Sequence, residues 1–509
     1  MHRSSTIAAL AVVIAAMAMV CLTPPAAADV TLPKVISDNM VVQRDVRARI
    51  WGWADPGEEV TVAIRGQAKT RAADARGSWR ILLDPMPAGG PFEMTVTGKN
   101  RIVVSNVAVG EVWVCSGQSN MAMRVASCLN FEQEKAAADY PMIRSLNGAI
   151  VSAAWPENDL GSGAWQVSTA DTVGGFSAAG YFFARHLHQQ LGVPIGFINV
   201  SLGGSAARAW VPAQDLRSDP DFAAWVNDIE AQVAEWNAGG AEYMKAYTAW
   251  QKEYNAAKAA GSTDLPKAPA FVRGRPQGLA TGLYNGMIAP LRPMKIAGAI
   301  WYQGEADAGA PELYQKLFPM LINSWRREFR FDDMPFLFVQ LADYDVASPW
   351  AFLREAQTKT LSLPNTGMAV ITDVGDAKDI HPKDKQTVGY RLALNALAKV
   401  YGQDVVYSGP MYRDMRIEGS TIRISFDHVH GGLVARDAEA PIGFTIAGED
   451  KQFVEAKAVI DGDTVLVSAD GVSNPVAVRY AWASDPECNL YNAEGLPANP
   501  FRTDDWPRQ

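Results

Sequence analysis

Five short apolar runs, separated by helical patterns, constrain the fold of this chain most strongly. The runs are at 112–115, 195–200, 296–302, 336–341 and 368–372. Helices are expected at 178–191, where Ser177 is a suitable cap, and at 311–327, 350–361 and 386–400. Strands that are buried on both faces read as continuous apolar runs and alternate with helices in parallel sheets. The pattern therefore predicts an α/β core with helices on both faces of a parallel sheet.

Strand-like segments flank this core on both sides, and a chain of 509 residues is too long for a single core. Short alternating runs between turn residues predict a small β-sandwich or barrel over 29–106 and a second β-rich region over 402–509. The α/β core then spans 107–401. A polar, Ala-rich segment at about 215–277 interrupts it. We expect two helices and a loop there, which either shape an entrance or pack without a role in binding.

Three tryptophans of the N-terminal β-rich region have two interpretations. Trp51, Trp53 and Trp79 lie in or beside alternating runs. Aromatic rings of this kind contact sugars in some proteins, but they more often fill a core or an interdomain contact. The sequence leaves both interpretations open.

The first 28 residues predict a secretory signal peptide. A basic start precedes an apolar run at 7–22, and the small residues that end at Ala28 form a cleavage site. An uncleaved anchor is the alternative, but the run is short for a membrane span. Lipid attachment at Cys21 would need a small residue where Val20 stands. We therefore expect an exported protein, periplasmic or extracellular, that is free of the membrane after cleavage.

The net charge limits the partners to be expected, and the cysteine content limits the disulfides. The net charge of −9 gives no basic field for nucleic acid or anionic lipid. After signal cleavage Cys115, Cys128 and Cys488 remain, so at least one thiol is unpaired within the chain. A bridge between Cys115 and Cys128 is possible. The fold is not expected to depend on disulfides.

Ser119 follows the first apolar run of the predicted core. The run stops at Gly117, which allows a sharp turn, so Ser119 is expected at the tip of the strand. The carboxyl ends of strands are where open α/β sheets bind their ligands. Ser119 is therefore either a nucleophile or simply a cap for the next helix, because serine is also a favoured N-cap.

A nucleophilic serine needs a base, and His381 is the best candidate among five histidines after residue 28. It lies in a loop after the apolar run at 368–372, and several aspartates precede it. His186 and His188 are two apart on one predicted helix and face different directions. His428 and His430 share one side of a strand-like segment and could bind a metal, but no third ligand is evident.

Acyl transfer also needs hydrogen-bond donors for the oxyanion, and two further strand ends supply them. The run at 195–200 leads to Gly203 and Gly204, and the run at 296–302 leads to Gln303. Each signal is weak alone. Chance is a poor explanation for the combination, in which three polar turns and one histidine loop all follow strands of one predicted sheet.

Four segments resemble the sialate O-acetylesterase family, a group of SGNH-type carbohydrate esterases. They are Gly117-Gln118-Ser119-Asn120-Met121, Tyr284-Asn285-Gly286-Met287-Ile288-Ala289-Pro290-Leu291, Trp301-Tyr302-Gln303-Gly304-Glu305-Ala306-Asp307 and Asp379-Ile380-His381-Pro382-Lys383. The resemblance implies a flavodoxin-like core that hydrolyses O-acetyl groups on sugars without a metal or other cofactor. It implies Ser119 as nucleophile and His381 as base. The amide of Ser119, the Gly203 region and Gln303 would form the oxyanion hole.

The residue that orients His381 departs from the pattern of this family. SGNH-type enzymes commonly carry an aspartate three residues before the histidine, and that position is Lys378 here. Asp379 lies two residues before His381 and Asp376 lies five before it. We favour Asp379, while a serine–histidine pair helped by a backbone carbonyl is the alternative.

The sequence does not select the sugar. Acetylated sialic acid, xylan, xyloglucan and pectin fragments all fit an exported glycan esterase. A lipase or peptidase is less expected, because Ser119 lacks a Gly-x-Ser-x-Gly elbow. A glycan-binding protein with an inert core is the remaining alternative.

Overall fold

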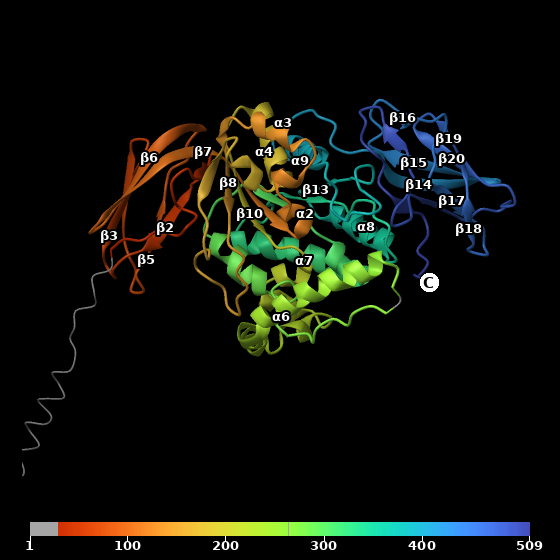
Figure 1. Ribbon diagram of the computed structural model, residues 1–509. Helices are drawn as coiled ribbons and strands as arrows, with labels where there is room; N and C mark the ends of the chain where they lie inside the picture. Colours follow the sequence, from red (N-terminus) through yellow and green to blue (C-terminus); the bar gives the residue numbers. More distant parts are fainter. Residues whose placement is uncertain (1–28, 263, 509) are drawn as a thin grey trace, which may run out of the picture.

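The computed structural model describes residues 29–262 and 264–508 (Figure 1). The predicted signal peptide, with Cys21, lies outside the described residues. A central α/β body lies between β-rich ends, which are red-orange and blue in Figure 1.

A mixed sheet forms the centre of the molecule, in the order β13-β12-β11-β7-β10-β8-β9. Neighbouring strands from β13 to β8 are parallel, and β9 pairs antiparallel with β8 at the edge. Each of the five predicted apolar runs overlaps a strand of this sheet. The strands are β7 (Arg101–Gly117), β8 (Tyr140–Asn147), β9 (Trp165–Ser168), β10 (Ile195–Ser201), β11 (Gly298–Tyr302), β12 (Phe336–Val339) and β13 (Thr366–Ala369).

The sequence did not predict β8 and β9. β8 carries Arg144 in its middle, and this side chain is 1% exposed. Its guanidinium donates hydrogen bonds to the backbone carbonyls of Asn39 and Asn106, so a charged residue fits a buried strand. Burial lowers the pKa of Arg144 to about 10. A cation inside a short run hides the apolar pattern by which buried strands are found.

Helices cover both faces of the sheet, as expected (Figure 1). α4 and α9 pack together in one apolar cluster with Trp113 and Cys115 of β7. α7 and α8 pack together on the opposite face, where the cluster includes Val112 and Val114. Ser177 caps α4 by accepting a hydrogen bond from the amide of Gly180, as predicted. The helices are α4 (Ala178–Leu191), α7 (Pro311–Phe329), α8 (Trp350–Lys359) and α9 (Lys385–Lys399).

β7 joins the N-terminal strands to the central sheet. Its first half pairs with β6 and β1, and its second half pairs with β10 and β11. The strand therefore runs without a break through residues 106 and 107, where the sequence predicted a boundary. The other N-terminal strands are β1 (Val41–Gln43), β2 (Arg49–Trp53), β3 (Glu59–Ile64), β4 (Gln67–Ala72), β5 (Ser78–Leu82) and β6 (Gly89–Thr97).

The C-terminal strands form three sheets around a separate apolar cluster. Their orders are β14-β15-β20-β19, β18-β17-β21-β23 and β16-β22. The strands are β14 (Met411–Glu418), β15 (Thr421–Asp427), β16 (Leu433–Ala435), β17 (Phe444–Ala447), β18 (Phe453–Glu455), β19 (Lys457–Asp461), β20 (Thr464–Ser468), β21 (Ala477–Tyr480), β22 (Leu490–Asn492) and β23 (Phe501–Arg502).

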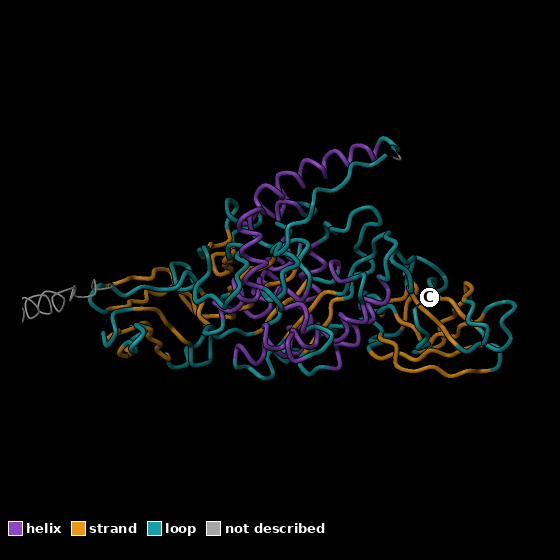
Figure 2. The backbone as a smooth tube through the Cα atoms, turned by 90° about the horizontal axis from the view of Figure 1, so that it is seen from below, coloured by secondary structure: helices purple, strands orange, loops and turns teal. Residues whose placement is uncertain are grey.

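The segment expected to hold two helices and a loop contains one short and one long helix. α5 (Ala213–Ser218) is followed by α6 (Ile229–Ala259), a helix of 31 residues that projects from the body in Figure 2. The loop at 264–277, which we call the returning loop, runs back along an aromatic face of α6. Phe271 of this loop contacts Tyr243, and Trp250 Nε1 donates to the carbonyl of Pro266. Within the described residues, no helix has both the length and the apolar character of a membrane span.

Gly117, at the end of β7, provides a test of the packing between β7 and β11. Its φ of +134° is unfavourable for other residues, and a Cβ there would lie 2.2 Å from the carbonyl oxygen of Tyr302. Gly117→Ala should lower the free energy of unfolding by about 2–5 kcal/mol, because backbone strain and a steric clash add. Chemical denaturation measures this change. Gly192→Ala is the control, since Gly192 also has a positive φ (+67°) but nothing lies within 4 Å of its added Cβ; equal losses in both variants would contradict the clash.

Candidate functional site

Ser119 lies at the carboxyl end of β7, as the first residue of the short helix α2 (Ser119–Ala122). The N-cap position of α2 belongs to Gln118, and no side chain caps this helix. The Ser119 hydroxyl is therefore not used as a helix cap. Gly117 makes the turn possible, and the amide of Gln118 donates to the carbonyl of Tyr302 at 3.0 Å, which fixes the turn against β11.

His381 lies beside Ser119, although 262 positions separate them in the sequence. The His381 Nε2 atom is 2.9 Å from the Ser119 hydroxyl oxygen. The histidine comes from the loop between β13 and α9, and its side chain is 39% exposed. A hydrogen bond of this length lets an imidazole take a proton from a serine hydroxyl.

The three aspartates before His381 have different partners. Asp379 accepts a hydrogen bond from the His381 backbone amide at 3.0 Å, and the same carboxylate oxygen is 3.4 Å from His381 Nδ1. Asp376 instead accepts from the amide of Lys378 at 2.9 Å. Of the three carboxylates, Asp379 is the one that contacts the imidazole.

Asp373 joins the core to the C-terminal strands. Its carboxylate forms a two-fold hydrogen bond with the guanidinium of Arg391 and accepts from the hydroxyl of Tyr491 in β22. Burial opposes ionisation of Asp373, but the charge and hydrogen bonds of Arg391 outweigh it and hold the pKa below its usual value. Asp373 therefore stays charged, and its contacts secure the start of the His381 loop.

Gly203 and Gly204 lie in the turn after β10, next to Ser119. A Cβ on Gly203 would lie 3.4 Å from the Cβ of Ser119. In the described chain, the backbone amides of Ser119 and Gly203 are not used in any turn or side-chain hydrogen bond. Two unused amides beside a serine hydroxyl are suited to bind a negatively charged oxygen.

Gln303 lies behind this turn, and its side-chain amide already has two partners. Its Nε2 atom donates to the carbonyl of Ser205 at 3.1 Å and to the carboxylate of Asp307 at 2.5 Å. Burial raises the pKa of Asp307, against the hydrogen bonds from the Ala207 amide and Gln303. In this geometry Gln303 supports the turn that carries Gly203, and its two N–H groups are occupied.

Two buried residues next to Ser119, Asn120 and Lys385, and the partly buried Glu305 were given no role in the sequence interpretation. The Lys385 ammonium, whose side chain is fully buried, donates to the side-chain oxygen of Asn120 at 2.7 Å. Asn120 Nδ2 donates to Glu305 at 2.6 Å and to the carbonyl of Ile380 at 3.0 Å. These contacts, which we call the Asn120 network, connect the three loops that carry Ser119, Gln303 and His381.

Burial shifts both ionisable groups of the Asn120 network toward their neutral forms. Burial lowers the pKa of Lys385 to about 8, although nearby Glu305, Asp379 and Asp384 raise it. Burial raises the pKa of Glu305, against the effects of Asn120, Lys385 and His381. Asn120 and Glu305 stand inside the quoted motifs, whereas Lys385 stands two residues beyond one, so the motifs would have found only part of this network.

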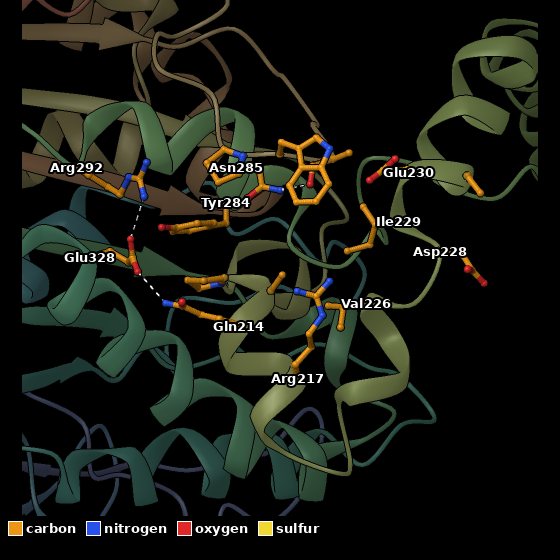
Figure 3. Close-up of a pocket in the computed structure, with 16 residues that line it drawn as sticks. Gln214, Arg217, Val226, Asp228, Ile229, Glu230, Tyr284, Asn285, Arg292 and Glu328 are labelled. Atoms are coloured by element: carbon orange, nitrogen blue, oxygen red, sulfur yellow. Dashed lines mark hydrogen bonds and ion pairs between the residues drawn. The ribbon is translucent and has the colours of Figure 1, made fainter. Parts of the chain in front are cut away.

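The projecting insertion reaches the neighbourhood of the site through its returning loop. Gln277 lies beside Gly204, and its carbonyl accepts from the amide of Ala206. The start of α6 borders a separate groove of about 560 Å³, shown in Figure 3, whose walls include Arg217, Ile229 and Tyr284. Neither Ser119 nor His381 lines this groove.

The other candidate residues are apart from Ser119. His186 contacts Tyr390 edge-on, and His188 Nδ1 lies 2.7 Å from the carbonyl of Val193. The rings of His428 and His430 stack on each other. Over residues 29–262 and 264–508, no three His, Cys, Asp or Glu side chains are grouped to hold a metal ion. Cys115, Cys128 and Cys488 are free thiols, so the possible bridge between the first two is absent.

Comparisons with known proteins agree on one family. The family described as carbohydrate esterase, sialic acid-specific acetylesterase, matches residues 257–398. The sialate O-acetylesterase of Mus musculus is 30% identical over 523 residues, covering 92% of this chain and 93% of the relative. The sialate O-acetylesterase of Homo sapiens is also 30% identical, and the match covers 92% of this chain and 91% of the relative.

A solved structure supports the same assignment. The crystal structure of a carbohydrate acetylesterase from Xanthomonas citri is 37% identical in sequence, with a TM-score of 0.81. The match covers 94% of this chain and 100% of that one. The chain therefore belongs to the sialate O-acetylesterase family of carbohydrate esterases, and it is a carboxylic ester hydrolase.

Proposed function

We propose that this enzyme is an exported, SGNH-type esterase that removes O-acetyl groups from sugars through a covalent acetyl-serine. The hydrogen bond of 2.9 Å between Ser119 Oγ and His381 Nε2 carries the proposal. Such a pair, at the carboxyl edge of a sheet and beside unused backbone amides, is suited to nucleophilic acyl transfer. Export rests on the sequence pattern of residues 1–28.

In the first half of the reaction, Ser119 Oγ attacks the carbonyl carbon of the acetyl group while His381 Nε2 accepts the hydroxyl proton. The carbonyl electron pair moves to oxygen, and the amides of Ser119 and of Gly203 or Gly204 donate to that oxyanion. Collapse of the intermediate breaks the bond between the acetyl carbon and the sugar oxygen. His381 then returns its proton to that oxygen, and the sugar hydroxyl leaves.

In the second half, water attacks the acetyl-serine, with His381 again accepting a proton. The oxyanion forms in the same place, and its collapse breaks the bond between the acetyl carbon and Ser119 Oγ. His381 returns its proton to Oγ, which restores the hydroxyl as acetate leaves. Asp379 orients the imidazole through Nδ1 and stabilises its charged form. Gln303 serves as a third oxyanion donor, which requires its amide to exchange the Ser205 carbonyl for the oxyanion.

The family supports an acetylated sugar as the substrate class, and the names of the relatives suggest which sugar. The relatives from Mus musculus and Homo sapiens are named for sialate, whereas the Xanthomonas citri protein is described only as a carbohydrate acetylesterase. We propose acetylated sugars of the sialate type as the substrate. Acetylated xylan, xyloglucan and pectin are the alternative.

Replacing the nucleophile tests the mechanism directly. Ser119→Ala should lower acetate release from acetylated sugars by about 10⁴–10⁶-fold, because no covalent intermediate can form. Ser116→Ala is a matched control three residues earlier on β7, where the buried hydroxyl has no hydrogen-bond partner. Acetate production by the purified proteins measures the effect. Equal rates for wild type and Ser119→Ala would end the proposal.

Substitutions of two aspartates in the His381 loop test which carboxylate orients the imidazole. Asp379→Asn should lower kcat by more than about 10-fold, but by less than the ~10⁴-fold known for a buried triad aspartate, because Asp379 is half-exposed. Asp376→Asn should leave kcat unchanged, since Asp376 bonds to Lys378. Steady-state kinetics on one aryl acetate compare the two. A larger loss in Asp376→Asn would reverse the assignment.

Lys385 is proposed as a positioning residue that acts through Asn120. Lys385→Met should lower kcat by about 10²-fold, because the loops of Ser119 and His381 lose their shared contact. In the wild type kcat should fall as the pH rises through about 8, where Lys385 loses its proton. This decline should be absent in Lys385→Met.

The free energy of unfolding should rise with pH over the range in which kcat falls. The pKa of Lys385 is about 8 in the folded protein and 10.5 in its ordinary state, so the unfolded chain binds the proton more strongly. Stability therefore rises between these pH values, and Lys385→Met should lack this rise. Lys359→Met is the control, because Lys359 is exposed at the end of α8 and pairs there with Glu355. A decline of kcat that persists in Lys385→Met would contradict the role.

A further inference from the structure

A cleft of about 770 Å³ lies between the N-terminal strands and the core. We call it the arginine cleft, and its polar and aromatic walls include Trp53, Arg71, Arg76, Arg80 and Asn158. β2 and β5, which supply two of these residues, lie at the left end of Figure 1, and α2, which begins at Ser119, lies in the middle. The arginine cleft is therefore separate from the catalytic edge of the sheet.

The pairing of β2 with β5 shows which side chains share a face of this two-stranded ribbon. Trp51 lies opposite Arg80, and Trp53 lies opposite Ser78, so these four share one face of the ribbon. Trp79 points to the other face and is 3% exposed. Of the three tryptophans with open interpretations, Trp51 and Trp79 belong to the buried core, and Trp53 offers a partly exposed ring on the same face as the exposed Arg80.

The charge in the arginine cleft is unbalanced. Arg71, Arg76 and Arg80 are exposed, and none of them has an ion pair with a carboxylate in the described chain. The one acidic residue that lines the cleft is Asp74, which accepts hydrogen bonds from the backbone amides of Arg76 and Ser78. The cleft therefore contains three guanidinium groups and a single carboxylate, and that carboxylate is already bonded to backbone amides.

Further cations lie next to this cluster. Arg49 on β2 lies near Arg80 and Arg330, and Lys295 lies near Arg49 and Arg330. Burial lowers the pKa of Arg49 and of Lys295, and the neighbouring positive charges lower both further. The whole chain has a net charge of −9, so this cluster is not a consequence of a generally basic surface.

Like charges repel, and gathering them lowers stability unless an anion offsets them. Guanidinium groups bind carboxylates with two parallel hydrogen bonds, and an indole ring gives a flat apolar surface for the C–H face of a sugar ring. We propose that the arginine cleft binds a carboxylated oligosaccharide, with Trp53 against a sugar ring and the arginines on carboxylates. Sialic acid and uronic acid units both carry this chemistry.

A binding site of this kind would hold an anionic glycan at a distance from Ser119. It would raise the local concentration of acetyl groups on a long chain without changing the chemistry of hydrolysis. Substitutions in the arginine cleft should therefore leave kcat/KM for a small aryl acetate unchanged. The proposal is independent of the catalytic roles, because binding can be measured when turnover is abolished.

The test is calorimetric titration of the full-length Ser119→Ala enzyme with four probes. These are a sialic acid oligomer, a galacturonic acid oligomer, a neutral cello-oligosaccharide and polyglutamate. At least one acidic oligosaccharide should bind, and its Kd should weaken at high ionic strength. The two acidic sugars distinguish the source of the carboxylate. Binding to polyglutamate alone, equal binding of the neutral sugar, or no binding to either acidic sugar would overturn the proposal.

Single substitutions in the same background locate the site. Arg80→Gln and Arg71→Gln should each weaken binding by about 10-fold, because a charge-assisted hydrogen bond is lost. Trp53→Ala should weaken it by about 5–10-fold. Arg273→Gln is the matched control, an exposed arginine on the returning loop of the insertion, outside the cleft. Equal weakening in Arg273→Gln, or unchanged binding in both arginine variants of the cleft, would refute the location even if Trp53→Ala folded poorly.

Discussion

The parallel pairing of β7 with β10 and β11 is the constraint on which the site depends. It brings the ends of these three strands to one edge of the sheet, so the turns that follow them meet. Ser119, Gly203 and Gln303 each follow one of these strands within a few residues. The close approach of Gly117 to Tyr302 excludes any side chain at the turn, so one glycine sets the position of the serine.

Lys385 and Glu305 both lie near Ser119, but they do not form a direct ion pair with each other. The amide of Asn120 lies between the two and contacts both, while it also bonds to the carbonyl before His381. Direct contact of two buried ions would give strong attraction but a large desolvation cost. The Asn120 amide instead holds the loops that carry Ser119, Gln303 and His381 together with directional hydrogen bonds.

The sequence predicted those parts of the molecule that follow from local patterns. The apolar runs, the Ser177 cap and the segments around Ser119 and His381 are all visible in short windows of sequence. β8 was missed because Arg144 finds its partners in distant carbonyls, those of Asn39 and Asn106. Lys385 was missed for the same reason, since its partner Asn120 is 265 positions away. Polar residues that are buried by distant contacts give no local signal.

β7 has a consequence for how the molecule can be divided. Its first half is bonded to the N-terminal strands and its second half ends at the turn that carries Ser119. A fragment starting at residue 107 would cut this strand and expose unpaired backbone groups along its edge, which favours aggregation. A fragment that keeps every pairing of β7 must therefore include the N-terminal strands β1 and β6.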